Sequence, residues 1–306
     1  MTIGFKARLH NEKAHVRRRN LFEGTTKNIL EGNEPGTFVL YFKDDHPLGK
    51  SDGAIREPLN GKGVINNRLS EMIFQRLGDL NIDHHLVCRL NMREQLVRIA
   101  EPVSFYVDVH NRSSDDFVLR FGYSKYHLLP EMITELRFKN KEAGDPVVGP
   151  QHLVSFGLSD HDELDQLFLT VQRVNDFLMG QFSALSMNLL RYKLEFGRVY
   201  MSENPLDTRL ILIDEISLDT CRVIDAHTNK RMDVFCNRVG YDYTGNDSAV
   251  REFMLSQNVD ECYDGVLGYH EIARRFGIIN TAASDLSDES PAIVIDDHVC
   301  AENKDK

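Results

Sequence analysis

The sequence predicts an α+β fold in two lobes. Strand-like runs dominate the first 121 residues, and one amphipathic helix interrupts them. A long segment with helical periodicity follows, and after it come a strand hairpin and a short final helix. Strands, one crossing helix, more strands and then helices are typical of α+β proteins. We expect four segments: a basic arm at 1–20, a β-rich lobe at 21–100, an α+β lobe at 101–280 and an acidic, disordered tail at 281–306.

The first lobe is expected to begin with two strands between Leu21 and Phe42. The residues from Gly32 to Gly36 are typical of a turn, and residues 43–63 form a long loop rich in Gly, Pro and Asp. Apolar residues at helical spacing predict a helix from Val64 to about Gly78. Further strands are expected near residues 86–90, 96–99, 103–109 and 117–121.

The second lobe contains the longest helical pattern, which runs from Asp160 to Asn188, and a final helix is expected at 263–276. Between them, residues 189–222 read as a hairpin with charged residues on its strands. Lys193 and Glu195 share a face because side chains alternate along a strand. We expect a cleft between the lobes, lined by this hairpin and by the turn at Gly24–Lys27.

Composition limits the class of partner. The 36 basic and 47 acidic residues give a net charge of −11, which argues against nucleic acid but allows a nucleotide in a local basic pocket. No apolar run is long enough to span a membrane, and the basic N-terminus lacks the apolar stretch of a secretory signal. The five cysteines show no CxxC spacing, so we expect reduced thiols and a cytoplasmic protein. We expect a small-molecule carboxylic acid and an amine as partners, and the sequence is compatible with a homo-oligomer.

Two small constellations suggest chemistry. Glu195 and Asp214 stand on the two arms of the hairpin, and two carboxylates at neighbouring strands form a hard-oxygen pair that suits Mg²⁺. The other interpretation is that both are solvated strand-end acids. The Gly24–Lys27 turn can place backbone N–H groups and a lysine over phosphates, or it is an ordinary hairpin turn. Gly61–Gly63 precedes a helix but lacks the other residues of a P-loop.

Longer motifs, taken in order, resemble those of the SAICAR synthetase family, and most closely its alphaproteobacterial branch. The resemblance covers about residues 19–278. The motifs include Arg19-Asn20-Leu21-Phe22-Glu23-Gly24-x-x-Lys27, Tyr41-Phe42-Lys43-Asp44-Asp45, Gly61-Lys62-Gly63-Val64-Ile65-Asn66-Asn67-Arg68, Arg89-Leu90-Asn91-Met92-Arg93-Glu94-Gln95-Leu96, Phe138-Lys139-Asn140, Lys193-Leu194-Glu195-Phe196-Gly197-Arg198 and Asp214-Glu215-Ile216-Ser217-x-Asp219-x-Cys221-Arg222.

The resemblance implies an ATP-dependent ligase that joins a carboxylated aminoimidazole ribotide to aspartate, on an ATP-grasp-like fold with ATP and Mg²⁺ between two lobes. It also implies roles for individual residues. By this resemblance, the nucleotide is contacted by Gly24, Thr25, Lys27 and Lys139, and Mg²⁺ is held by Glu195 and Asp214. The catalytic residues are Lys193, Asp219 and Arg222, and the substrate is contacted by His110, Asp115, Asp116, Arg191 and Ser217.

The chain departs from the family at several of these positions. Thr25 stands where the family has a lysine, and His110 replaces an arginine that grips the ribotide phosphate. Asp115 and Asp116 replace a glycine and a serine of the same motif, and Arg191 replaces an aspartate. Two carboxylates facing a phosphate would repel it. We therefore expect a paralogue with an altered acid substrate. The alternatives are an ordinary SAICAR synthetase and a catalytically silent binder of nucleotide or of a partner.

Overall fold

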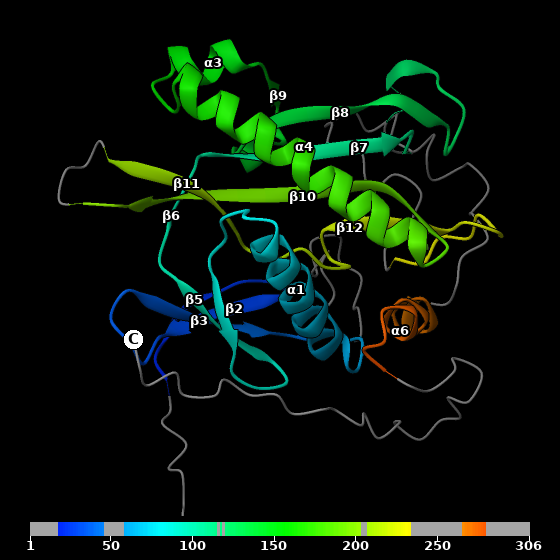
Figure 1. Ribbon diagram of the computed structural model, residues 1–306, viewed down its shortest axis with the longest axis horizontal. Helices are drawn as coiled ribbons and strands as arrows, with labels where there is room; N and C mark the ends of the chain where they lie inside the picture. The colour runs from blue at the N-terminus through cyan, green and yellow to red at the C-terminus, as the bar shows by residue number, and fades with distance from the viewer. Residues whose placement is uncertain are drawn as a thin grey trace, which may run out of the picture.

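The computed structural model describes residues 18–45, 58–114, 117, 120–202, 207–233 and 265–279. Two antiparallel sheets and the helices packed around them make up this part of the chain (Figure 1). The α+β fold class is therefore confirmed. The segment boundaries expected from the sequence stay predictions, and most of the basic arm and all of the acidic tail lie outside the described residues.

The N-terminal sheet has five strands in the order β1-β2-β3-β5-β4. They are β1 (Asn20–Glu23), β2 (Lys27–Glu31), β3 (Thr37–Phe42), β4 (Leu86–Arg89) and β5 (Glu94–Arg98). Three strands, rather than the expected two, fill residues 20–42, because the chain turns at Gly24 as well as at Gly36. A Cβ on Gly24 would lie 2.8 Å from the Lys27 carbonyl oxygen, so this tight turn requires glycine. Helix α1 (Lys62–Asp79) packs beside this sheet.

The second sheet is built around one long strand, β10 (Met187–Tyr200). Its main path is β11-β10-β7-β8-β9, and β6 and β12 also pair with β10. The other strands are β6 (Glu101–Pro102), β7 (Phe105–Arg112), β8 (Leu128–Phe138), β9 (Val147–Val148), β11 (Thr208–Ile213) and β12 (Cys221–Asp225). The short helices η1 (Lys141–Ala143) and α3 (Pro150–Ser155) follow β8 and β9 in the chain.

The second sheet has one apolar and one charged face. Tyr192, Leu194 and Phe196 on β10 belong to the main core cluster, and α4 (His161–Ala184) packs against this strand (Figure 1). Because side chains alternate along a strand, Lys193 and Glu195 lie on the opposite face. Asp160 begins α4 by accepting a hydrogen bond from the Glu163 amide at 2.8 Å, a side-chain N-cap. The fold thus leaves one face of the sheet for polar chemistry.

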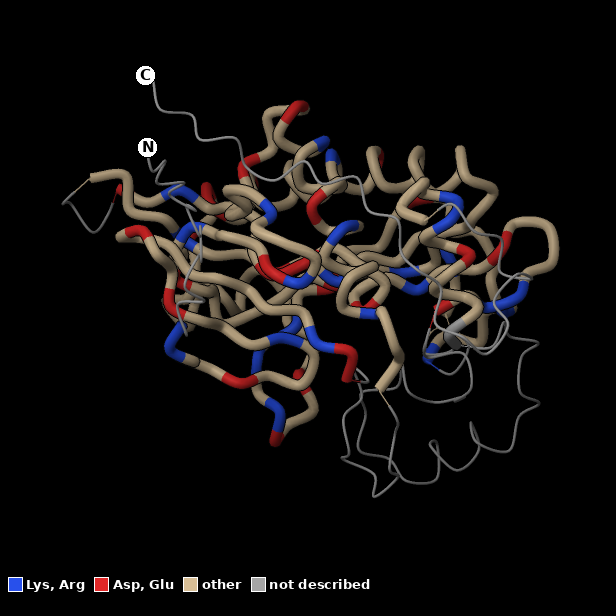
Figure 2. The backbone as a smooth tube through the Cα atoms, turned by 90° about the horizontal axis from the view of Figure 1, so that it is seen from below, with Lys and Arg blue, Asp and Glu red and all other residues tan. Residues whose placement is uncertain are grey.

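Helix α6 (Gly265–Arg275) packs beside α1 (Figure 1). Ile272 and Ala273 of α6 enter the same core cluster as Leu69 and Ile73 of α1. Within the described residues, no helix is long and apolar enough to cross a membrane. Figure 2 shows acidic and basic positions interspersed along the described backbone.

Three expectations about local structure were wrong. Phe117, Arg120 and Phe121 are helical, so the strand expected at 117–121 does not form at these described positions. The long helix ends at Ala184, because β10 already begins at Met187. Strand β8 went unrecognised because Glu135 and Arg137 interrupt its apolar pattern; both are buried and paired, so the strand tolerates them.

Cys221 is a buried free thiol, whereas Cys88 is disulfide-bonded, contrary to the expectation of reduced thiols.

Candidate active site

Glu195 lies between two lysines on the charged face of the second sheet. Its Oε1 lies 2.5 Å from Lys193 Nζ, and its Oε2 lies 2.7 Å from Lys139 Nζ. Lys139 follows directly after β8 and also donates to the Val103 carbonyl at 2.8 Å. Both oxygens of the carboxylate are therefore paired with cations, one on β10 and one just after β8. Lys193 also lies over the ring of Tyr106, 4.4 Å from its centroid, which adds a cation–π contact.

A second lysine–carboxylate group links the two sheets. Lys27 begins β2 in the N-terminal sheet, and its Nζ lies 2.5 Å from Asp214 Oδ1 and also pairs with Glu215. Burial opposes the charge on Lys27, but the two carboxylates outweigh burial and raise the pKa of the lysine. Burial and the neighbouring Asp219 raise the pKa of Glu215, whereas Lys27 and Lys193 overcome burial and lower the pKa of Asp214.

Asp214 is held by its backbone as well as by Lys27. Its φ of 68° is in the left-handed region, which non-glycine residues seldom adopt. The His85 ring lies with Nε2 2.9 Å from the Asp214 carbonyl oxygen. Burial lowers the pKa of His85 to about 4, so the ring is neutral at pH 7. Because a carbonyl can only accept, the proton of this neutral ring lies on Nε2. Residue 214 directly follows Ile213, the last residue of β11 and the register partner of Glu195, so one predicted metal ligand lies on β10 and the other just past the end of the neighbouring strand.

The three predicted residues that follow Asp214 and Glu215 have different surroundings. Ser217 is fully buried and donates its hydroxyl to Glu215. Asp219 bonds to Lys62 and Tyr269, and its side chain is only 6% exposed. Arg222 lies on β12, with its Nη1 3.3 Å from the carbonyl of Cys221. The structure therefore places this segment beside the lysine–carboxylate groups, and all three side chains make contacts within the protein.

His110 and Arg191 lie on neighbouring strands as direct register partners. His110 is fully buried, and its Nε2 lies 3.6 Å from Glu135 Oε2. Arg191 lies 3.2 Å from Asp108 Oδ2, which Arg137 also contacts at 3.0 Å. A buried, alternately charged network thus occupies the end of the charged face nearest to β12. Asp115 and Asp116, predicted to contact substrate, lie outside the described residues.

The predicted nucleotide turn is present. Gly24 accepts a bond from Lys43 Nζ at 3.3 Å and donates its amide to Lys27 at 2.8 Å, while Thr25 at the tip is exposed. Among the described residues, no group of three or more His, Cys, Asp and Glu side chains could hold a metal. Glu195 and Asp214 alone still fit Mg²⁺, because this ion commonly takes one or two protein carboxylates and completes its shell with phosphates and water.

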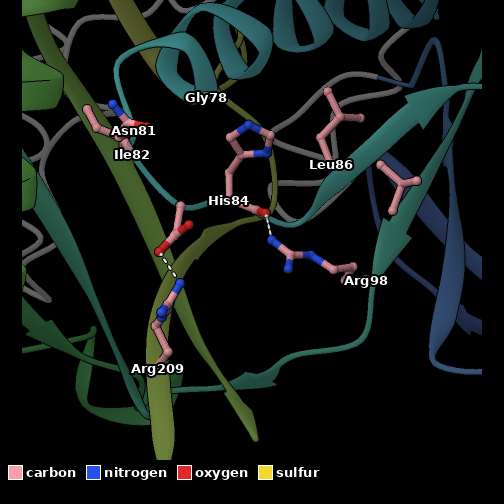
Figure 3. Close-up of a pocket in the computed structure, with 9 residues that line it drawn as sticks. Gly78, Asn81, Ile82, His84, Leu86, Arg98 and Arg209 are labelled. Carbon is pink, nitrogen blue, oxygen red and sulfur yellow. Dashed lines mark hydrogen bonds and ion pairs between the residues drawn. The ribbon is translucent and has the colours of Figure 1, made fainter. Parts of the chain in front are cut away.

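One open pocket of about 590 Å³ lies away from these groups, where the end of α1 meets β4, β5 and β11 (Figure 3). Arg98 donates to the His84 carbonyl at 2.6 Å, and Arg209 pairs with Asp83 at 3.1 Å (Figure 3). The pocket contains none of the predicted site residues. We place the candidate active site at the lysine–carboxylate groups, because charged side chains from both sheets meet there.

The sequence matches the family model described as SAICAR synthetase over residues 20–245. The chain belongs to the SAICAR synthetase family. Phosphoribosylaminoimidazole-succinocarboxamide synthase from Rhodospirillum centenum is 43% identical over 218 residues, which cover 71% of this chain and 84% of the relative. The enzyme of the same name from Novosphingobium aromaticivorans is 38% identical over 280 residues, covering 92% and 95% of the two chains. The expectation of an ATP-dependent ligase of the SAICAR synthetase family is confirmed.

Solved SAICAR synthetase structures share the fold. The phosphoribosylaminoimidazole-succinocarboxamide synthase from Ehrlichia chaffeensis superimposes with a TM-score of 0.70 at 28% identity, over 85% of this chain and 99% of that chain. A SAICAR synthetase in complex with ADP superimposes with a TM-score of 0.67 at 28% identity, over 83% and 96% of the two chains.

The sequence did not reveal every residue that builds this SAICAR synthetase site. Glu215 was noted only as part of an acidic pair, although it is more deeply buried than Asp214 and shares Lys27 with it. Lys62 was noted in a failed P-loop pattern and within a family motif but was given no role, yet it pairs with Asp219 at 2.5 Å.

Proposed function

We propose that the chain is a SAICAR synthetase in the strict sense, which joins a carboxylated aminoimidazole ribotide to aspartate and splits ATP to ADP and phosphate. The observation that carries the proposal is the meeting of two lysine–carboxylate groups, Lys27 with Asp214 and Glu215, and Lys139 and Lys193 with Glu195. The curated relatives share the enzyme's name, and a structural relative is titled as an ADP complex.

The geometry supports a specific use of these groups. The lysines are already held in place by carboxylates, so they can exchange a carboxylate partner for a phosphate oxygen with little reorganisation. Glu195 and Asp214 would hold Mg²⁺, which supplies neutralisation of the phosphate charge. Lys27 comes from the N-terminal sheet, whereas Lys139 and Lys193 come from the second sheet, so a triphosphate between them would be gripped from both sides.

Amide formation then needs two transfers. A carboxylate oxygen of the ribotide attacks the γ-phosphorus, ADP leaves, and an acyl phosphate results. The aspartate amine attacks the acyl carbon, phosphate leaves, and the nitrogen gives up a proton. The chain's task in both steps is to hold the reactants in contact and to neutralise charge on the transferring group. Lys139 and Lys193 are the cations placed to do so, because they stand on either side of Glu195.

The test is ADP release by the purified protein with carboxyaminoimidazole ribotide, aspartate and MgATP, together with detection of the succinocarboxamide product. We expect product formation that stops when any one of the three substrates is left out. ADP release without product, or no release at all, would contradict the proposal.

A second candidate, a ligase for a different acid, rests on the network around His110. A fully buried histidine beside Glu135 is a weaker phosphate ligand than an exposed arginine. The discriminating measurement offers the protein a panel of carboxylic acids with aspartate and MgATP. Turnover with an acid that lacks the ribotide phosphate, and none with the ribotide, would favour this candidate.

A further inference from the structure

Lys62 is one of the most deeply buried charged residues of the described chain. It is the first residue of α1, its side chain is 1% exposed, and its Nζ lies 2.5 Å from Asp219 Oδ2. The partner comes from the segment just before β12 in the other sheet. Because the ammonium group is buried and paired, Lys62 is not available to bind a phosphate in the way that a P-loop lysine does. Its surroundings indicate a structural relationship with Asp219 instead.

The backbone around Lys62 is itself fixed. The Asp44 carboxylate accepts the amides of Gly63 at 2.8 Å and Gly61 at 3.4 Å. Arg93 grips the same carboxylate with two hydrogen bonds, at 2.8 and 2.7 Å. A carboxylate at the first turn also stabilises the positive end of the helix dipole. Lys62 therefore reaches across the lobes from a rigid base.

A second donor completes the partners of Asp219. The Tyr269 hydroxyl of α6 donates to Asp219 Oδ1 at 2.7 Å, and this tyrosine is 2% exposed. Each carboxylate oxygen thus receives a donor from a different helix. We call Lys62, Asp219 and Tyr269 the Asp219 triad. It ties α1, α6 and the segment before β12 together at one buried point.

The triad continues as hydrogen bonds into the candidate active site. The Asp219 amide donates to Ser217 Oγ at 3.1 Å, and the same hydroxyl donates to Glu215. Glu215 in turn pairs with Lys27. One unbroken series of polar contacts therefore runs from α6, through the segment that carries Asp214, to a lysine of the N-terminal sheet.

We propose that Lys62 and Tyr269 are positioning residues, which hold Asp219 and thereby fix the segment 214–220 and its lysine-bound carboxylates in catalytic geometry. Neither side chain needs to touch a substrate for this. Small displacements of a reacting group lower turnover strongly, whereas ground-state binding is less sensitive to them. The statement about turnover rests on the proposed function, while the statement about the segment does not.

The test uses Tyr269→Phe in the full chain, because it removes one hydroxyl and leaves packing intact. We expect kcat to fall at least about tenfold, while the KM for ATP and the Kd for MgADP change less than about threefold. Hydrogen exchange should speed up at the amides of Asp219, Thr220 and Cys221, which bond to Ser217. Lys62→Met should also lower kcat and speed up hydrogen exchange at these amides. In the double variant, the fold-decrease in kcat should be smaller than the product of the two single fold-decreases, because both side chains act on one carboxylate.

Tyr192→Phe is the matched control. Its hydroxyl is also fully buried and bonds at 3.2 Å to Asn175, on the apolar side of β10. The Tyr192→Phe variant should lose about as much stability as Tyr269→Phe. Its kcat and the hydrogen-exchange rates of amides 219–221 should nevertheless equal those of the wild type. If Tyr269→Phe and the control give equal kcat, the positioning role is overturned.

The two proposals can fail separately. If the wild type forms no product from the ribotide, the proposed function fails. Hydrogen exchange alone then tests whether the Asp219 triad fixes the segment 214–220. Faster exchange at 219–221 in Tyr269→Phe, with none in Tyr192→Phe, upholds the fixing of the segment. Unchanged exchange in both variants overturns it, whatever the enzyme's substrate.

Discussion

Arg191 lies directly across the strand pair from His110, on the charged face of the second sheet. The family resemblance places an arginine at position 110 and an aspartate at position 191, so this chain has moved the cation to the neighbouring strand. The pair thereby loses its carboxylate and keeps Arg191 as its permanent cation. Because register partners share a face, the Arg191 guanidinium lies close to residue 110, where the family has its arginine. This relationship supports retention of an anionic substrate.

Arg191→Met tests this compensation. If Arg191 stands in for the missing arginine, the variant should raise the KM for the ribotide about tenfold or more, the usual cost of a lost charge-assisted hydrogen bond. The KM for ATP should stay unchanged, and Arg191→Lys should recover part of the loss. Steady-state kinetics with each substrate varied in turn provides the measurement.

The control is Arg209→Met, which removes an exposed arginine paired with Asp83 outside the site. It should leave all three KM values as they are. Equal effects of the two substitutions, or an unchanged ribotide KM in Arg191→Met, would show that Arg191 has no role toward the substrate.

Glu195→Gln tests the predicted magnesium site. MgATP should raise the melting temperature of the wild type, because a ligand that binds only the native state stabilises it. The shift should vanish in Glu195→Gln and also in the wild type with EDTA in excess over Mg²⁺. The unliganded variant should remain folded, although Lys139 and Lys193 lose their shared partner. Differential scanning fluorimetry gives both values.

Glu163→Gln is the matched carboxylate control. Glu163 pairs with Arg198 at 2.6 Å, away from the lysine–carboxylate groups. Its MgATP shift should equal that of the wild type. Should Glu195→Gln keep a full shift, Glu195 does not bind the metal.

Much of this site was predictable from the sequence because strand alternation is a local property. The spacing of Lys193 and Glu195 places both on one face, whatever the rest of the chain does. The family motifs supplied Lys27, Lys139 and Asp214. What no local pattern supplies is the pairing across sheets: Lys27 meets Asp214 although 187 residues separate their numbers.

The unpredicted parts share one physical cause, which is burial of charge. Strand β8 carries Glu135 and Arg137 in its interior, so its pattern reads as irregular until their partners are known. Lys62 likewise looks like a surface residue in the sequence, and only Asp219 explains its burial. Buried charges require partners that are distant in the chain, and one sequence alone does not reveal them.

Lys27→Met should destabilise the unliganded protein. It leaves Asp214 and Glu215 without their cation in a buried site, and breaking such a pair costs about 3–5 kcal/mol. The conservative Lys27→Arg should lose less, since the charge stays. Lys43→Met is the control: Lys43 pairs at 2.6 Å with Asp45, which is 44% exposed, and such a pair contributes about 1 kcal/mol or less. Urea unfolding followed by circular dichroism measures all three, and equal losses for the two methionine variants would contradict the prediction.

The ion pair between Asp225 of β12 and Arg275 of α6 leads to a prediction of how acid affects stability. Burial alone would raise the pKa of Asp225, but amide hydrogen bonds around Thr228 and the Arg275 guanidinium at 2.5 Å prevail and lower the pKa to about 2. A carboxyl whose folded pKa lies below its unfolded value stabilises the fold above the unfolded pKa, about 4. That contribution disappears as the pH falls from about 4 toward 2. Arg275→Met raises the pKa of Asp225, so the variant should be less stable than the wild type at neutral pH, and the difference should shrink toward pH 2.

Arg274→Met is the control for this helix, because Arg274 is 42% exposed and pairs with Glu271 at 2.7 Å within α6. It should change the pH dependence only through Glu271, whose pKa is lowered by hydrogen bonds from Arg274 and Arg275, and it should leave the contribution of Asp225 in place. Chemical unfolding at a series of pH values between 2 and 7 gives the three stability curves. A constant difference between Arg275→Met and the wild type across this range would show that the Asp225 carboxylate does not tie α6 to the sheet, and that Arg275 acts through packing alone.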